Sequence, residues 1–263
     1  MGENPHEVYI NGNKEGKIIL SQAPNYLHQL YVFFSRLGAL EFENATRVWA
    51  VANIAIGLSI SIVLALHWKL GRTATYLAVS IFLCSTPFRN GVGNGQHALF
   101  VMAFLILPFF QFRGKYLLQG LGYSKYSFAP PFFLYNFFYS GSLKAMTGLI
   151  LPIIGFLLFC SWTETSPVTA ATQPLEVASR AVGAGTADLM SVMEVFLGMG
   201  TTLSGTVTLI FAAILSFLIS RHPDSDKHLP LISLVCLVTF KHLAYDFVFL
   251  LPVFVYSLKI KSF

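Results

Sequence analysis

Long apolar runs that contain almost no charged residue are the feature that most constrains how this 263-residue chain can fold. Hydrophobic residues make up 55% of the chain and charged residues 11%, whereas soluble globular domains carry about 25% charged residues. A backbone in hydrocarbon must satisfy its own hydrogen bonds, and a helix of about 20 apolar residues does so while it crosses a bilayer. The composition therefore predicts an all-α, polytopic transmembrane helical bundle rather than a soluble domain.

Turn residues and charges divide the apolar runs into about eight to nine membrane segments. The runs 116–126 and 130–140 are too short to cross about 30 Å at a rise of about 1.5 Å per residue. They are predicted to form a broken hairpin around Lys125, or one interrupted helix. The other expected segments are 48–66, 75–87, 96–112, 145–162, 201–220, 229–240 and 247–258.

The same pattern predicts four regions along the chain. Residues 1–47 form an N-terminal segment with an interfacial helix over 26–40, and residues 48–162 form a first group of membrane helices. Residues 163–200 form a loop with two short helices, one starting at Pro174 and one after Thr186 with Asp188 in its first turn. Residues 201–263 form the C-terminal membrane helices.

The basic residues predict an orientation, because cytoplasmic loops are enriched in Lys and Arg. If nine segments are counted, all the basic loops fall on one side, and the acidic loop 163–200 falls on the other. We therefore expect a multi-pass membrane protein, in a bacterial inner membrane, with its C-terminus in the cytoplasm. The net charge of +5 then reflects topology, and nucleic acid is not an expected partner. The basic loops carry Lys69 and Arg72, Arg113 and Lys115, Lys144, Arg221 and Lys227, and Lys259 and Lys261.

A glycine-rich segment, residues 89–97, lies between two apolar runs. Glycines at this density let backbone amides approach a ligand closely, and carboxamides add directional donors and acceptors. The segment is either a plain connecting turn or a loop that faces a ligand, and its place on the outer side favours the ligand. Its residues are Arg89, Asn90, Gly91, Val92, Gly93, Asn94, Gly95, Gln96 and His97.

Two further polar groups are expected near the outer leaflet, namely Lys125 and the run from Lys241 to Asp246. His242 and Asp246 would share one face if their segment were helical, and ionisable groups at membrane depth usually face a cavity or a partner. Together with Arg89, the two lysines place three cations where few are expected, which favours an anion such as a lipid phosphate. The structural alternatives are snorkelling of Lys125 towards the headgroups and a His242–Asp246 pair that joins the last two helices.

Other site chemistries lack their sequence signatures. There is no zinc-ligand spacing, no phosphate-binding P-loop and no convincing nucleophile–base pair, and the alternating glycines have no preceding strand. Cys84, Cys160 and Cys236 lie in apolar runs without paired spacing and are interpreted as packed thiols. We therefore expect no metal and no cofactor, and the sequence leaves the catalytic residues unknown.

Four segments, taken in order, resemble the polyprenol-phosphate-sugar-dependent membrane glycosyltransferases of glycosyltransferase family 87, which have a GT-C architecture. The first runs from 23–26 through 33–40 to Trp49, and the second is 94–96, which opens an apolar run. The third runs from 120 through Lys125 to Pro130. The fourth is 242–246, followed by Leu250, Leu251 and Pro252.

The resemblance implies an enzyme that transfers a hexose or pentose from polyprenyl phosphate to a lipid or glycan acceptor at the outer face. A carboxylate would deprotonate the acceptor hydroxyl, which would attack the anomeric carbon with inversion, while cations stabilise the departing phosphate. The implied partners are membrane lipids and the polyprenyl-phosphate-linked sugar. The expected substrate-binding residues are Arg89, Asn90, Asn94, Gly95, Gln96, Lys125, Lys241, His242 and Asp246.

The chain also departs from the family pattern. Arg36 and Asn25 stand where the family has proline, and the resemblance implies a first transmembrane helix and a catalytic carboxylate that have no match here. Glu7 is the nearest acidic residue. A second hypothesis is therefore a catalytically inactive, GT-C-derived subunit that serves the assembly of a larger membrane complex. A transporter or another lipid-handling protein is the third.

Overall fold

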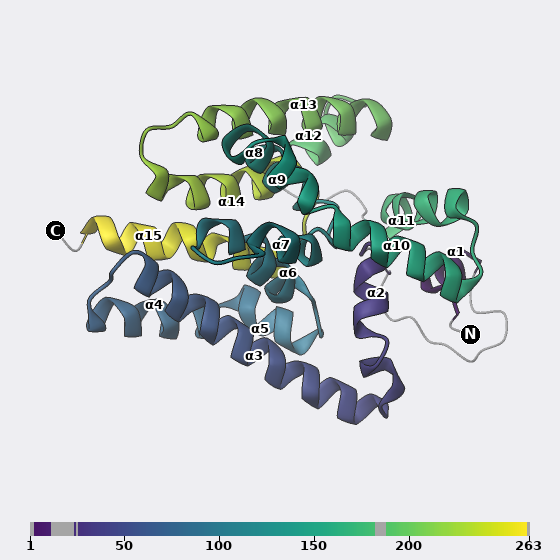
Figure 1. The fold of residues 1–263 in the computed structure, drawn as a ribbon, viewed down its shortest axis with the longest axis horizontal. Coiled ribbons are helices and arrows are strands. Elements are labelled where there is room, and N and C mark those ends of the chain that lie inside the picture. Colours follow the sequence, from purple (N-terminus) through teal and green to yellow (C-terminus); the bar gives the residue numbers. More distant parts are fainter. Residues whose placement is uncertain (1–2, 12–23, 25, 182–187, 262–263) are drawn as a thin grey trace.

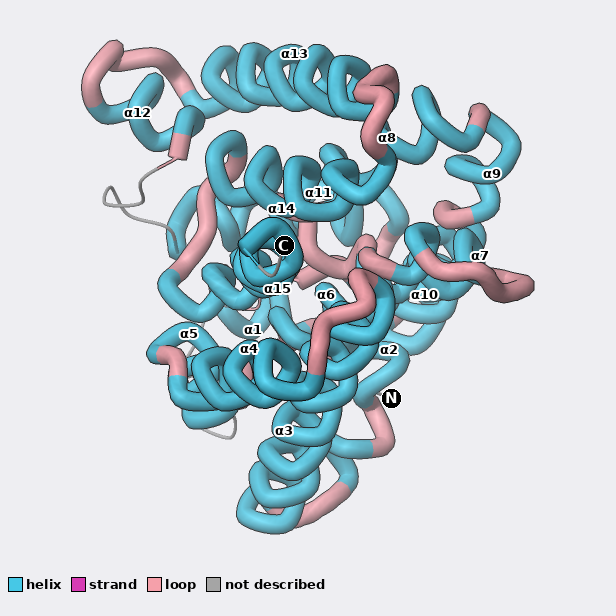
Figure 2. Tube along the Cα trace, turned by 90° about the vertical axis from the view of Figure 1, so that its left-hand side faces the viewer, coloured by secondary structure: helices cyan, strands magenta, loops and turns pink. Residues whose placement is uncertain are grey.

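The computed structural model describes residues 3–11, 24, 26–181 and 188–261, and within these residues it contains helices and turns but no strand (Figure 1). The tube view shows the same helical bundle turned by 90° (Figure 2). The predicted all-α class is confirmed for this part of the chain. The N-terminal residues Lys14, Lys17, Ala23 and Asn25 lie outside the described residues.

Among the described residues, three helices are long and apolar enough to cross a membrane. They are α3 (Phe42–His67), the run Ser142–Thr163 that joins α9 (Ser142–Thr147) to α10 (Ile150–Thr163), and α13 (Thr201–Ser220). Each contains one of the expected segments 48–66, 145–162 and 201–220. Most of their side chains are not buried in the protein, as for helices that present apolar residues to lipid.

The remaining expected segments are built from shorter helices, so eight to nine full-length spans are not found in the described chain. A bent pair, α5 (Thr86–Gly93) followed by α6 (Ala98–Leu105) and the 3₁₀ helix η2 (Leu107–Phe109), turns through 113° and can count as a fourth span. The glycine-rich segment contains the bend. The other short helices are α4 (Arg72–Cys84), α7 (Lys115–Gly122), α8 (Ala129–Ser140), α14 (His228–Thr239), η4 (Ala244–Leu250) and α15 (Leu251–Lys261).

Prolines and glycines explain where several of these helices begin and end. Pro130 and Pro131 lie in the first turn of α8, where a missing N–H costs nothing, and Gly141 ends that helix with a φ of +94°. The predicted break separates α7 from α8, and Asn136 of α8 donates to the Gln119 side-chain oxygen of α7 (2.6 Å), so the two helices form a hairpin rather than one interrupted helix. Ser85 caps α5 by accepting a hydrogen bond from the Phe88 amide (3.4 Å), with Pro87 in the first turn.

The connections between helices alternate between two ends of the bundle, which we name after the two ends of α3. At the Trp49 end, the indole Nε1 of Trp49 donates to the Gly95 carbonyl (2.9 Å), and the loops that carry Lys125 and Asp246 meet. At the His67 end, the His67 ring contacts the Phe110 ring, with centroids 5.2 Å apart. Helix α15 ends on this side, away from α1 and α2 (Figure 1).

Basic loops gather at the His67 end. The Tyr116 hydroxyl donates to Ser140 Oγ (2.8 Å), which joins the start of α7 to the end of α8, and Lys144 lies 5.9 Å from the Tyr116 ring centroid. Lys259 of α15 pairs with Asp226 of the 3₁₀ helix η3 (Ser225–Lys227). The contacts therefore bring loops together that the positive-inside pattern had grouped on one side.

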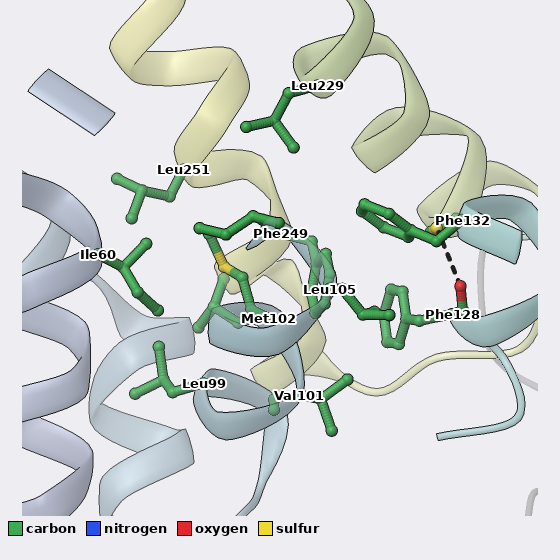
Figure 3. Close-up of a cluster of buried hydrophobic side chains, with 14 of the residues drawn as sticks. Ile60, Leu99, Val101, Met102, Leu105, Phe128, Phe132, Leu229, Phe249 and Leu251 are labelled. Carbon is green, nitrogen blue, oxygen red and sulfur yellow. Dashed lines mark hydrogen bonds between the residues drawn. The ribbon is translucent and has the colours of Figure 1, made fainter. Parts of the chain in front are cut away.

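The hydrophobic core is centred on α6, which is buried on nearly all sides, as expected for a helix that is apolar all round. Phe128 stacks on Phe249 with ring centroids 4.0 Å apart, and the Cys236 thiol lies 3.8 Å from the Phe128 carbonyl oxygen (Figure 3). Side chains from α3, α6, α8, α14, η4 and α15 meet there, namely Ile60, Leu99, Val101, Met102, Leu105, Phe128, Phe132, Leu229, Phe249 and Leu251.

The N-terminal helices pack beside the bundle, against α10 and the first helix of the predicted loop 163–200. Helix α1 (Pro5–Asn11) contacts α11 (Pro167–Ala181), and α2 (His28–Phe34) contacts α10. The expected interfacial helix over 26–40 is broken into α2 and the 3₁₀ helix η1 (Leu37–Ala39).

The predicted start of a helix at Pro174 is wrong. Helix α11 begins at Pro167, because the Ser166 hydroxyl accepts from the Thr169 amide (3.2 Å), and Pro174 lies inside the helix. The second short helix is confirmed as α12 (Leu189–Val195), although Asp188 caps it rather than lying in its first turn. The Asp188 carboxylate accepts from the Ser191 amide (2.8 Å).

We predict that Gly122→Ala destabilises the contact between α6 and α7. A Cβ at this position would lie 2.8 Å from the Leu105 nitrogen and 2.9 Å from the Val101 carbonyl oxygen, so the backbone would have to move. The free energy of unfolding should fall by about 1–3 kcal/mol in detergent. Gly91→Ala in α5 is the matched control, since its Cβ meets open space, and an equal loss in both variants would contradict this packing.

Candidate functional site

A buried ion pair between Lys125 and Asp246 lies at the centre of the Trp49 end. Lys125 belongs to the connection between α7 and α8, and Asp246 belongs to η4; their side chains are 5% and 1% exposed. The second carboxylate oxygen of Asp246 accepts a hydrogen bond from the Leu243 amide (2.9 Å). Both oxygens are therefore engaged within the protein.

Three aromatic rings surround the Lys125 ammonium group. Its nitrogen lies 5.0 Å from the ring centroid of Tyr245, 5.3 Å from that of Phe128 and 5.6 Å from that of Tyr26. Aromatic faces carry partial negative charge and attract a cation. The rings therefore replace part of the water that the ammonium group loses on burial.

Tyr26 links this lysine to the glycine-rich segment. Its hydroxyl donates to the Gln96 side-chain oxygen (3.3 Å) and accepts from the His97 amide (3.3 Å). Gly95 has a φ of +63°, which a residue with a side chain rarely adopts, and its carbonyl accepts from Trp49. Gly95 and Gln96 thus form a hydrogen-bonded bend that is held from two sides.

The side chains of Arg89, Asn90 and Asn94 are not part of this network. Arg89 is exposed on α5, Asn94 is exposed at the end of that helix, and Asn90 is half-buried. The segment therefore combines the two interpretations that the sequence left open, because Gly95 and Gln96 act as a structural turn while Arg89 and Asn94 face outwards.

Lys241 and His242 take different partners. Lys241 pairs with Glu194 of α12, and Glu194 also accepts from Ser204 Oγ of α13 (3.1 Å). The His242 ring lies with Nδ1 3.2 Å from the Phe240 carbonyl oxygen. The expected helical face shared by His242 and Asp246 is wrong, because residues 241–243 are not helical and Asp246 pairs with Lys125 instead.

The three predicted outer cations are therefore not equivalent. Asp246 neutralises Lys125 and Glu194 neutralises Lys241, whereas no carboxylate pairs with Arg89 in the described part of the chain. The sequence did not reveal these two pairs, because each acidic residue is far from its lysine along the chain. Of the three cations, Arg89 is the one whose charge remains for an external anion.

A small cleft opens beside the ion pair and has a volume of about 10 Å³, which is about the space that one water molecule needs. It brings together four of the expected site residues, whereas Arg89, Asn90 and Asn94 lie outside it. The lining is Lys125, Tyr126, Lys241, His242, Leu243, Tyr245 and Asp246.

Sequence reasoning did not assign roles to several residues of this site, namely Tyr26, Trp49, His97, Phe128, Glu194 and Tyr245. Tyr26, Trp49 and Tyr245 lie in the segments that carry the family resemblance, but nothing local indicates that two of their rings would face Lys125. The sequence places Glu194 in an acidic loop but does not indicate its partner. Their partners are distant in sequence, so a local pattern does not reveal them.

Two buried histidines lie next to each other in the N-terminal helices, and one of them, His6, contacts Tyr26. His6 Nε2 lies 3.2 Å from the Tyr26 carbonyl oxygen, and His28 Nε2 lies 2.9 Å from that of Ala170. The two rings are 5.4 Å apart. Burial, and in second place the nearby His28, lower the pKa of His6 from 6.5 to about 4, and burial lowers the pKa of His28.

We predict that breaking the buried ion pair is more harmful than removing both charges. Lys125→Met or Asp246→Leu alone leaves one charge buried without its partner, which costs about 3–5 kcal/mol of unfolding free energy. The double variant should recover part of that loss, because neither charge remains. Thermal unfolding in detergent measures all three, and additive losses in the double variant would contradict the pairing.

We also predict that acid destabilises the protein through His6. Between about pH 6.5 and pH 4 the unfolded chain binds a proton that the folded His6 does not, so stability is full above pH 6.5 and falls as the pH drops. Each unit of pKa difference corresponds to about 1.4 kcal/mol. His6→Gln keeps a donor but cannot titrate, so its melting temperature should fall less over this range, whereas parallel curves would contradict the role of His6.

Comparison with known proteins gives no match to a protein-family model, to a curated protein or to a solved structure.

Proposed function

We propose that this chain is a GT-C-type membrane glycosyltransferase that binds a polyprenyl-phosphate-linked sugar at the Trp49 end. One observation carries the proposal. The segments that resemble the family are far apart in sequence, yet Tyr26, Gln96, Lys125 and Asp246 form one chain of contacts. Contacts between all four of these segments are expected if they share one binding site, and are not expected if each resemblance is accidental.

The proposed path through the membrane has nine segments. Connections alternate between the Trp49 end and the His67 end, and the short helices would pass as pairs or inside the bundle. The segments are α3, α4 with α5, α6 with η2, α7, α8, α9 with α10, α13, α14, and η4 with α15. The positive-inside rule places the His67 end, with the C-terminus, in the cytoplasm of a bacterial inner membrane.

In this proposal Arg89 contacts the lipid phosphate, and Asn90 and Asn94 offer carboxamides to the sugar hydroxyls. The acceptor oxygen bonds to the anomeric carbon, the bond from that carbon to the phosphate oxygen breaks, and the acceptor proton passes to a base. Arg89 stabilises the charge that develops on the leaving phosphate. Gln96, Tyr26 and the ion pair position the bend that presents Arg89, and Lys241 and His242 line the adjoining cleft.

The non-catalytic subunit is the second candidate, and a specific observation favours it. The two carboxylates that contact the cluster, Asp246 and Glu194, are each paired with a lysine. A general base needs a free oxygen within reach of the acceptor proton. A chain that binds the lipid-linked sugar but lacks this base would bind without transfer and would serve a membrane complex.

We predict that Arg89→Ala weakens donor binding and transfer by about tenfold, since it removes one charge-assisted contact. The assay uses purified protein in lipid vesicles with a radiolabelled polyprenyl-phosphate hexose and extracted membranes as acceptor. Arg113→Ala, an exposed cation of the other end, is the control and should bind and transfer as the wild type does.

The outcomes separate the two candidates. Transfer that Arg89→Ala reduces supports the enzyme, whereas binding without transfer, together with co-purification of a partner complex, supports the subunit. Wild-type protein that neither binds nor transfers the donor would contradict both.

A further inference from the structure

A cavity wider than the cleft beside the ion pair lies at the opposite end from the proposed sugar site. It occupies about 270 Å³ at the His67 end, close to the lower limit of about 300 Å³ for small-molecule sites. Its walls come from α3, η2, α7, α8, η3 and α14, and most of the residues that line it are polar or aromatic with a polar group. None of the residues that the family resemblance singled out lines it.

Lys115 supplies a fixed positive charge in this cavity. Its ammonium group donates to the Pro108 carbonyl (2.8 Å) and to the Phe110 carbonyl (2.9 Å). These bonds hold the charge in place without neutralising it, and no carboxylate pairs with Lys115 in the described part of the chain. The ammonium group retains a third N–H for a ligand.

Two neighbouring features add to this positive field. Lys144 lies 5.9 Å from the Tyr116 ring centroid and is exposed. Helix α7 begins at Lys115 directly after Gly114, which has no side chain to cap the first amides. The N-terminus of a helix attracts anions, because its first amides point outwards and the helix dipole is positive there.

The acidic residue in the lining does not cancel this field. Asp226 pairs with Lys259, and the neighbouring Asp224 lies 3.4 Å from the Lys227 ammonium group. Another part of the lining is a stack of rings, in which Tyr135 lies 5.3 Å from both Phe109 and Tyr139. The cavity therefore joins a cationic edge to an aromatic wall.

We propose that this cavity binds a phosphate group, held by Lys115 and the first turn of α7, with the rest of the ligand against the aromatic wall. The phosphate can belong to the headgroup of an anionic lipid or to a soluble phosphate ester. Basic pockets between membrane helices on the cytoplasmic side are sites of this kind. This inference does not rest on glycosyl transfer.

The experiment measures binding of two probes to the full chain in phosphatidylcholine nanodiscs. One arm titrates phosphatidylglycerol and counts retained lipids by native mass spectrometry, and the other titrates sn-glycerol 3-phosphate and follows the melting temperature. Wild-type protein should bind at least one probe. Lys115→Gln keeps a donor near the two carbonyls but loses the charge, so affinity should fall about fivefold.

A second variant guards against the chance that Lys115→Gln does not fold. Gln111 lines the cavity and is exposed, so Gln111→Glu should fold normally, and it should weaken phosphate binding by repulsion. Gln111→Lys should bind at least as tightly as the wild type. Arg72→Gln removes an exposed cation at the same end outside the cavity and should leave affinity unchanged.

The pattern of results decides the proposal and the source of the phosphate. Binding in the lipid arm alone assigns a lipid headgroup, and binding in the glycerol-phosphate arm alone assigns a soluble ester. Wild-type protein that binds neither probe overturns the proposal. An equal loss in Arg72→Gln and Gln111→Glu also overturns it, because it would show diffuse attraction to a basic surface.

Discussion

The buried pair of Lys125 and Asp246 joins the loop between α7 and α8 to the start of η4, and the stacked rings of Phe128 and Phe249 join the same two segments. Each charge would cost several kcal/mol to bury alone, so the loop between α7 and α8 and the start of η4 must come together for either to be buried. The rings of Tyr26, Phe128 and Tyr245 then close over the ammonium group. The position of the glycine-rich bend follows from the same pair, since Tyr26 bonds both to the backbone and to the side chain of that bend.

A second constraint comes from the many short helices. A helix that ends inside the bundle leaves backbone groups that lipid cannot satisfy, and buried side chains bond to several of them. Gln119 Nε2, for example, donates to the Leu105 carbonyl at the end of α6 (3.0 Å). Lys115 does the same for η2. Some polar residues in the apolar runs therefore have a structural role, which is to bond to backbone carbonyls at the ends of short helices.

The sequence predicts those parts of the fold that depend on local properties. Apolar length identifies α3 and α13, and Pro130 with Pro131 identifies the break between α7 and α8. The pairs that build the candidate site escape this reasoning, because Asp246 follows Lys125 by 121 residues and Lys241 follows Glu194 by 47. A local pattern reveals neither that distant acids neutralise two of the three outer cations nor that His242 lies outside a helix. Of these cations only Arg89 has no carboxylate partner within the described residues, and its binding role stays a prediction.

The hydrogen bond from Trp49 to Gly95 bears on the depth of the glycine-rich bend in the membrane. Indole rings favour the headgroup level of a bilayer, with the N–H towards polar partners, and Trp49 follows the polar first turns of α3 within one turn of Arg47. Its bond to the Gly95 carbonyl ties the bend to the same depth. A ligand anchored in the leaflet by its own hydrocarbon tail would thus reach Arg89 by lateral diffusion in two dimensions, without leaving the membrane.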